Sequence, residues 1–237
     1  MPKAAIIVER ILYAIFPKRC AICNRVITPA TDACTDCRQG ELPRVFPPVC
    51  QMCGRGKSEC LCRNYRFYYS GLAAPFYYEG VIGKSIRNFK FRGKTGNAGF
   101  FAHEMANTVK KQFAGKGFDL IACVPLTKNS YRIRGFNQSF LLAKEIGAVL
   151  NIETSRDLLI KLYDTPAQHT MTSSMRRGNL AGVFDVTKPE LVKGNTILIC
   201  DDVATTGSTI NECAKMLLLY GAKEVCCITA AVTRKAK

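Results

Sequence analysis

Residues 196–209 of the 237-residue chain run TILICDDVATTGST, and this stretch decides the fold. It begins with a continuously apolar run, which is typical of a parallel strand buried on both faces. Two adjacent carboxylates, Asp201 and Asp202, stand at the end of that run. The carboxyl ends of parallel strands are where open α/β sheets bind their ligands. The stretch therefore predicts an α/β fold with a ligand site at the end of this strand.

A loop of small and hydroxylated residues follows the two carboxylates and leads into a helix predicted over 209–220. Gly207 allows the backbone to approach a ligand closely, and amides beside a helix N-terminus favour a phosphate. Adjacent carboxylates repel each other unless they accept hydrogen bonds from sugar hydroxyls or face Mg²⁺. We therefore predict a ribose-phosphate site; the structural alternative is a Ser/Thr-rich helix cap without a ligand. The predicted phosphate contacts are Ala204, Thr205, Thr206, Gly207, Ser208 and Thr209.

Strand and helix patterns alternate through the rest of the C-terminal part. This alternation predicts parallel pairing and a Rossmann-like sheet. The composition changes near residue 65, so we predict two domains, 1–65 and 66–237. Strands are predicted at 71–78, 119–125, 196–203 and 225–233, and helices at 81–91, 98–113, 136–150 and 209–220.

Eight of the thirteen cysteines lie between residues 20 and 62. The start of the chain, residues 1–16, has the pattern of an amphipathic helix and not of a secretory signal. Metal ligation is therefore favoured over disulfides, with a cytoplasmic location. Four thiolates from two turns make a structural zinc site, although pairing across the two sets stays open because the second has a shorter spacing. The predicted ligands are Cys20, Cys23, Cys34 and Cys37, then Cys50, Cys53, Cys60 and Cys62.

The chain is strongly basic, with 34 Lys and Arg against 18 Asp and Glu, a formal charge of +16. Three windows contain basic residues and no acid: 80–103, 120–144 and 165–184. Such windows favour a surface for phosphates, of a nucleotide or of a nucleic acid, over ordinary solvated Lys and Arg. No apolar run reaches eighteen residues, so no membrane-spanning helix is predicted.

Several motifs resemble known families. Residues 197–209 resemble the 5-phosphoribosyl-1-diphosphate (PRPP) binding motif of type I phosphoribosyltransferases. Residues 124–126 (VPL) and 131–139 (YRIRGFNQS) are similar to a signature of the ComF family of competence-associated proteins. Residues 89–93 (FKFRG) and the RRGNL stretch at 176–180 are similar to two further segments of that family. Together with the cysteine module, the resemblance spans nearly the whole chain.

The resemblance implies a double zinc ribbon joined to a Rossmann-like domain of the type I phosphoribosyltransferase fold. Asp201 and Asp202 would be the catalytic pair and would hold the ribose hydroxyls of PRPP with Mg²⁺. Residues 204–209 would hold the 5′-phosphate, and the turn after Pro125 would form the pyrophosphate loop. The candidates for pyrophosphate or nucleic-acid phosphates are Lys90, Arg92, Arg132, Arg134, Arg176 and Arg177.

Three functions stay open. The first is a protein that binds PRPP and Mg²⁺ and handles single-stranded DNA in natural transformation, with DNA-uptake or recombination proteins as further partners. Aromatic residues between 65 and 78 would then stack on bases, although core packing is commoner at such positions. The alternative is an active transferase that moves 5-phosphoribosyl to an unidentified nitrogenous acceptor, and the third is a scaffold acting through its zinc ribbons. No general acid or base stands out, since His103 and His169 suit surface or packing roles.

Overall fold

The computed structural model describes residues 15–60, 62, 65–91, 95–163 and 182–234. Most of the predicted N-terminal helix lies outside these residues, and so do Arg92, Arg176, Arg177 and His169. No helix of the described residues is long and apolar enough to cross a membrane.

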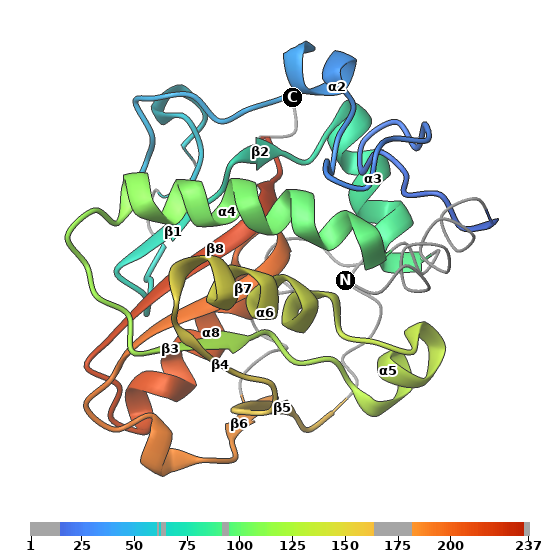
Figure 1. Cartoon of the computed structure of the whole chain (residues 1–237). Helices are drawn as coiled ribbons and strands as arrows, with labels where there is room; N and C mark the ends of the chain where they lie inside the picture. Colours follow the sequence, from blue (N-terminus) through green and yellow to red (C-terminus); the bar gives the residue numbers. More distant parts are fainter. Residues whose placement is uncertain (1–14, 61, 63–64, 92–94, 164–181, 235–237) are drawn as a thin grey trace.

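A parallel sheet forms the centre of the fold, with strand order β1-β8-β7-β3-β4 (Figure 1). The predicted Rossmann-like parallel sheet is thereby confirmed. The long central pair β7 and β8 is buried over nearly its whole length, as the apolar run predicted. A short strand, β2, also pairs with β8, further along it than β1 does. The bounds are β1 Gly71–Ala73, β2 Phe76–Tyr77, β3 Leu120–Cys123, β4 Glu153–Ser155, β7 Thr196–Ala204 and β8 Glu224–Val232.

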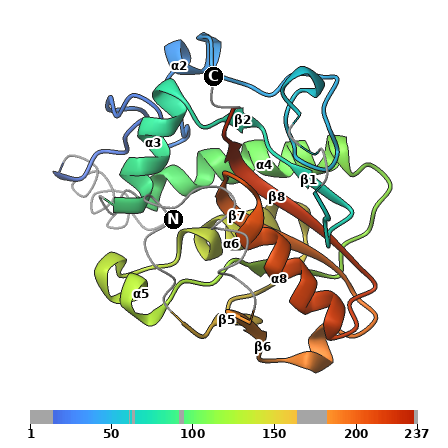
Figure 2. The same cartoon turned by 180° about the vertical axis from the view of Figure 1, so that it is seen from behind.

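Helices cover both faces of the sheet (Figures 1 and 2). Because side chains alternate across a strand, Leu198 and Cys200 of β7 pack with the helices on one face, while Ile197 and Ile199 pack with α8 on the other. Phe101 of α4 is fully buried in the first of these cores. The first face carries α3 Gly80–Phe91, α4 Ala98–Gln112 and α6 Gln138–Leu150, and the second carries α8 Ser208–Leu219.

Several short elements were not predicted from the sequence. An antiparallel pair, β5 with β6, lies apart from the main sheet, and a helix, α5, follows the turn after Pro125. Each of these two strands has three residues, too few for a periodic pattern, and their partners are more than twenty residues apart in the chain. The bounds are α2 Thr35–Gln39, η1 Lys57–Glu59, η2 Thr95–Asn97, α5 Lys128–Arg134, β5 Leu159–Lys161, β6 Phe184–Val186 and η4 Pro189–Leu191.

The cysteine-rich segment packs directly against the sheet domain through both of its cysteine turns. In the first cysteine turn, the Ala21 carbonyl accepts a hydrogen bond from Ser85 Oγ of α3. In the second, the Leu72 N–H of β1 donates to the Gln51 carbonyl at 2.8 Å. A Cβ on Gly54 would lie 2.6 Å from Leu72 Cδ2, so this turn needs glycine to approach β1. The division into domains 1–65 and 66–237 stays a prediction, and the two segments share a packed interface.

Candidate functional site

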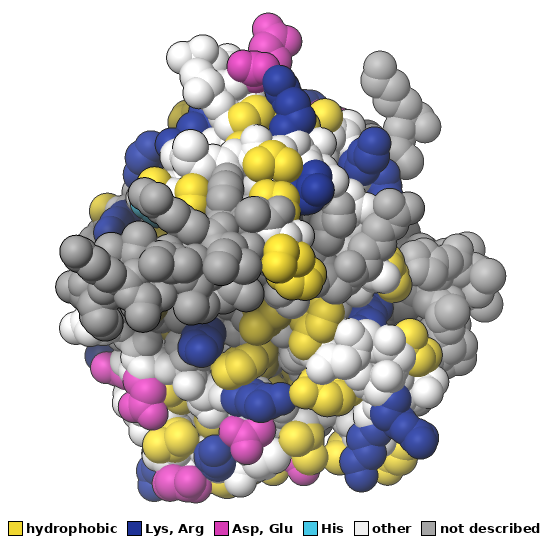
Figure 3. Space-filling model, turned by 45° about the vertical axis from the view of Figure 1, so that its right-hand side comes forward, with side chains coloured by type: hydrophobic (Ala, Val, Ile, Leu, Met, Phe, Trp, Pro, Cys, Tyr) yellow, Lys and Arg dark blue, Asp and Glu magenta, His cyan; other side chains and the backbone are white. Residues whose placement is uncertain are grey.

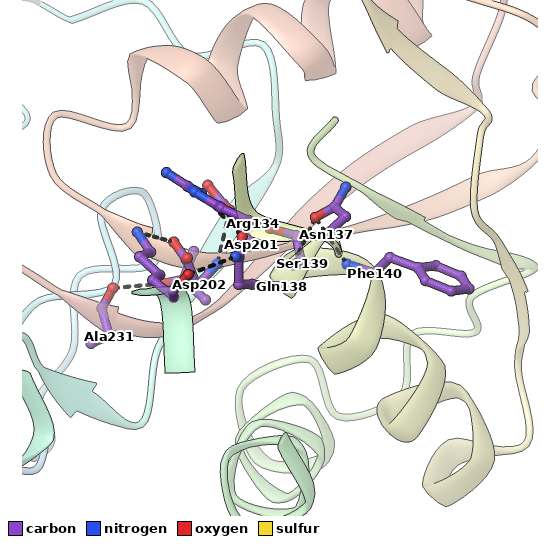
Figure 4. A network of polar contacts seen from close by, with 10 residues as sticks. Arg134, Asn137, Gln138, Ser139, Phe140, Asp201, Asp202 and Ala231 are labelled. Atoms are coloured by element: carbon purple, nitrogen blue, oxygen red, sulfur yellow. Dashed lines mark hydrogen bonds and ion pairs between the residues drawn. The ribbon is translucent and has the colours of Figure 1, made fainter. Parts of the chain in front are cut away.

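Asp201 and Asp202 occupy the carboxyl end of β7 and are held by partners from two different helices (Figure 4). Asp201 Oδ1 accepts hydrogen bonds from Ser139 Oγ at 2.7 Å and from the Asp202 N–H at 2.8 Å. Asp202 is buried, and its Oδ1 lies 2.8 Å from Lys90 Nζ. Ser139 belongs to the first turn of α6 and Lys90 to the last turn of α3, so the packing of these helices fixes both carboxylates.

Burial raises the pKa of Asp201 to about 7, and the charge of Asp202 contributes to the rise. The nearby Lys90 and the hydrogen bond from Ser139 oppose it. Burial by itself lowers the pKa of Lys90, but the Asp202 carboxylate overcomes that effect and raises it. Asp201 is therefore an easily protonated carboxyl group close to the ammonium group of Lys90.

The loop after β7 presents several backbone amides without an acceptor among the residues that the structure describes. Within the described residues, the N–H groups of Thr205, Thr206, Gly207 and Thr209 donate no hydrogen bond. The Ser208 N–H lies 3.3 Å from Thr206 Oγ1. Gly207 has φ +76°, a left-handed conformation that suits glycine. It occupies the N-cap position of α8, where it offers no side chain to accept hydrogen bonds from the first amides of the helix. Free amides at an uncapped helix start form a typical site for an anion.

One cavity of about 470 Å³ is lined by both carboxylates and by the loop residues other than Thr206, which lines a separate, smaller cavity. The wall of the larger cavity also includes the turn 124–127, the segment predicted as the pyrophosphate loop. Of the predicted basic residues, Lys90 and Arg134 line this cavity, while Arg132 is exposed on α5 and does not. The structure therefore brings together residues from α3, the 124–127 turn, α5, β7 and α8.

Residues at the N-terminus of α6 form hydrogen bonds with several parts of the cavity wall. Asn137 caps the helix, accepting from the Ser139 N–H at 2.9 Å, and its side-chain amide donates to the Val124 carbonyl at 3.1 Å. Gln138 is buried and connects two cavity residues: it accepts from Arg134 Nη1 at 3.1 Å and donates to the Lys90 carbonyl at 3.3 Å. The RGFNQS stretch thus positions the basic groups of the site.

Sequence reasoning missed four residues of this region: Tyr78, Ser139, Lys161 and Arg55. The first three line the cavity, and Arg55 donates a hydrogen bond to the Thr205 carbonyl in the loop after β7. Ser139 ends the YRIRGFNQS motif and lies in the first turn of the helix predicted at 136–150, so its place in the motif could have marked it as a site residue. Lys161 belongs to the unpredicted strand β5, and no sequence pattern placed it near β7.

Basic side chains are spread among hydrophobic ones on the face shown in Figure 3 and do not form a single stripe. Three of the aromatic residues between 65 and 78, Tyr69, Phe76 and Tyr77, are buried in the core. These three are therefore not available to stack on bases. Tyr65, Phe67 and Tyr68 are half-buried.

The eight clustered cysteines form two groups of four, matching the within-set pairing expected from the spacing. In each group the sulfur atoms lie within 4.8 Å of one another. Cys23 and Cys34 Sγ are 3.7 Å apart, Cys50 and Cys62 Sγ 3.7 Å, and Cys50 and Cys60 Sγ 3.4 Å. A zinc–sulfur bond of about 2.3 Å gives a tetrahedral sulfur–sulfur edge of about 3.8 Å. Both groups therefore fit a zinc ion with four thiolate ligands.

Comparison with known proteins agrees with this geometry. A family model described as a phosphoribosyl transferase domain matches residues 137–237. The DNA utilization protein YhgH of Salmonella typhimurium is 29% identical over 209 residues, which is 87% of this chain and 86% of that protein. Competence protein ComFC of Bacillus subtilis is 27% identical over 206 residues, 83% and 82% of the two chains. Competence protein F of Haemophilus influenzae is 34% identical over 109 residues, 45% of this chain and 47% of that protein.

The parallel sheet and the matched domain give the C-terminal part of the chain a fold of the phosphoribosyltransferase type. The relatives named for competence and DNA utilization confirm the resemblance to the ComF family seen in the sequence.

The raised pKa of Asp201 predicts a pH dependence of stability. The native state keeps this proton up to about pH 7, whereas the unfolded chain releases it near pH 4. Between these values the native state binds more protons, so the group makes the free energy of unfolding fall as pH rises. Relative to the wild type, Asp201→Asn should gain stability between pH 5 and pH 8, by roughly 2 to 4 kcal/mol. Urea unfolding at both pH values measures this, and parallel profiles would contradict it.

The two cysteine groups predict two zinc ions per chain. Cys23→Ser and Cys60→Ser, which alter exposed ligands of different groups, should each lower the metal content to about one ion. Cys213→Ala, which alters a buried cysteine of α8, should keep two. Elemental analysis of the purified chains measures the stoichiometry. A wild-type chain without zinc, with all eight clustered thiols open to a thiol reagent, would rule the sites out.

Proposed function

We propose that the cavity at the end of β7 binds PRPP together with Mg²⁺. The observation that carries the proposal is the meeting of adjacent carboxylates with a loop of unused amides in one cavity. The loop 204–209 would take the 5′-phosphate, because its N–H groups and the start of α8 favour a dianion. Asp201 and Asp202 would accept hydrogen bonds from the ribose hydroxyls. Lys90, Arg134 and the 124–127 turn would face the pyrophosphate.

The donor set also fits Mg²⁺. Within the described residues, neither Asp201 Oδ2 nor Asp202 Oδ2 accepts a hydrogen bond. Mg²⁺ binds through one or two carboxylates plus substrate phosphates and retains waters. The cation would neutralise the charge that PRPP adds beside these carboxylates.

Ligand binding should depend on the two carboxylates. The double variant Asp201→Asn with Asp202→Asn removes both charges, and we expect PRPP affinity in Mg²⁺ to fall at least about 10-fold, as for lost hydrogen bonds to charged groups. Isothermal titration calorimetry measures it. Glu190→Gln, which removes an exposed carboxylate of η4, serves as the control and should bind as the wild type does. No binding by the wild type, or equal binding by the double variant, would contradict the proposal.

An active transferase is the second candidate, and one observation favours it. Asp201, with its pKa raised to about 7, can gain or lose a proton near neutral pH, as general acid–base catalysis requires. Among the described residues the histidine is His103, which belongs to α4 and lines a different cavity. Such an enzyme would transfer 5-phosphoribosyl from PRPP to a nitrogenous acceptor and release pyrophosphate. Pyrophosphate assays with a panel of nucleobases and amines separate turnover from binding.

We also propose that the protein handles single-stranded DNA, with proteins of DNA uptake or recombination as partners. The support is the formal charge of +16 and the names of the relatives, which refer to competence and DNA utilization. Arg132, exposed on α5, and the half-buried ring of Tyr68 are the described groups that would contact a strand. The guanidinium of Arg66 already lies 5.2 Å from the Tyr68 ring centre.

Single-strand binding should be strongly salt-dependent. Each phosphate neutralised contributes a slope of about −0.7 to the plot of log affinity against log salt concentration. We expect a slope steeper than about −2 for an oligothymidine, measured by fluorescence anisotropy at several salt concentrations. Arg132→Gln should make the slope shallower, and Glu190→Gln should not. A flat slope or no binding would remove the DNA proposal and leave the PRPP proposal intact.

A further inference from the structure

The two cysteine turns have the same local structure. Residues 20–25 and 50–55 each place an arginine two positions after the second cysteine. In both turns the N–H of the first cysteine donates to the carbonyl of that arginine at 2.7 Å. The residue before the arginine has φ 67° in the first turn and 68° in the second. The side chains of Arg25 and Arg55 are therefore in equivalent backbone settings and can be compared directly.

The two arginine side chains differ in their burial and in their partners. Arg25 is at the surface and pairs with Asp36, with Nη2 and Oδ2 2.6 Å apart. Arg55 is only 5% exposed. Its Nε donates to the Thr233 carbonyl and its Nη2 to the Thr205 carbonyl, both at 2.6 Å. One guanidinium group thus connects the second cysteine turn to the end of β8 and to the phosphate loop.

The contact with Thr205 fixes the direction of a loop amide. In a trans peptide the C=O of one residue and the N–H of the next point in opposite directions. With the Thr205 carbonyl held by Arg55 and by Thr233 Oγ1 at 3.2 Å, the Thr206 N–H must point away from the cysteine turn. That N–H is one of the amides left unused within the described residues. Arg55 therefore holds the peptide group between Thr205 and Thr206 in one orientation.

The buried positive charge of Arg55 needs a nearby negative charge, and the second cysteine group would supply it with zinc bound. No described carboxylate forms an ion pair with this buried guanidinium. Arg55 shares a cavity of about 160 Å³ with Cys53, Cys62 and the loop 204–207. A zinc ion held by four thiolates carries a net charge of about −2. A buried cation costs much less free energy beside such a group than without one.

We propose that the second zinc site controls the phosphate loop through Arg55, so that zinc in this site raises the affinity of the cavity for PRPP. Arg55 is a positioning residue, since it contacts the Thr205 carbonyl of the loop and would not touch the ligand. The first zinc site, whose arginine faces Asp36, does not have this effect. As far as the ligand is concerned, this inference rests on the proposed function. By linkage, PRPP should in turn slow the loss of zinc from the second site.

The experiment compares Arg55→Gln with the matched control Arg25→Gln, both loaded with zinc. PRPP affinity in Mg²⁺ should fall about 10-fold in the first variant, within the range usual for coupled sites, and stay unchanged in the second. Hydrogen exchange without ligand gives an independent measure. The amides of Thr233 and Asn211 donate to the carbonyls of Ala204 and Gly207, so they should exchange faster only in Arg55→Gln.

A second pair of variants covers the case in which Arg55→Gln does not fold. Cys60→Ser and Cys23→Ser alter exposed ligands of the second and the first site. Only Cys60→Ser should weaken PRPP binding and speed the exchange of these two amides. Equal affinity and equal exchange within each pair would overturn the inference. A wild-type chain that fails to bind PRPP would instead refute the proposed function, and the exchange comparison would still decide the role of Arg55.

Discussion

Repulsion between two adjacent carboxylates on a buried strand is the constraint on which the site depends. Asp201 and Asp202 follow each other at the end of β7, where little water reaches them. Each carboxylate has its own compensation: a hydroxyl from α6 for Asp201 and an ammonium group from α3 for Asp202. Both helices pack on the same face of the sheet, so the core that holds them also holds the charges in place.

The cysteine-rich segment extends this dependence to the other side of the loop. The cysteine turns contain few residues able to form a core of their own, and metal ligation replaces core packing in such segments. The second turn docks on β1 through Gly54 and reaches the loop through Arg55. The loop after β7 is therefore held between the sheet and the second cysteine turn, which gives its amides a fixed direction.

Much of this could be predicted from the sequence because the signals were local. The apolar run before Asp201, the glycine in the loop and the CxxC spacing each reflect the geometry of a few consecutive residues. The strands β4, β5 and β6 were missed because three residues carry no period and their pairing is set by tertiary contacts. Helix α5 was missed because Thr127, whose Oγ1 accepts from the Ser130 N–H, starts a helix where a turn was expected.

The roles of individual basic residues were harder to predict than the fold. Lys90 was expected to face phosphates, and the structure shows it paired with Asp202 while lining the same cavity. Arg55 was one of several arginines around the cysteines, with nothing in its neighbours to distinguish it from Arg25. Only the three-dimensional packing separates a buried guanidinium on a loop carbonyl from an exposed one on Asp36.

The central claim is that the unused amides after β7 bind the phosphate of a sugar phosphate. An NMR titration of the ¹⁵N-labelled chain with PRPP and Mg²⁺ tests it most directly. We predict that the amide signals of Thr205, Thr206, Gly207 and Thr209 shift the most, in the direction of stronger hydrogen bonding. Shifts that are absent from these four amides, or that are largest on another face of the molecule, would contradict the account.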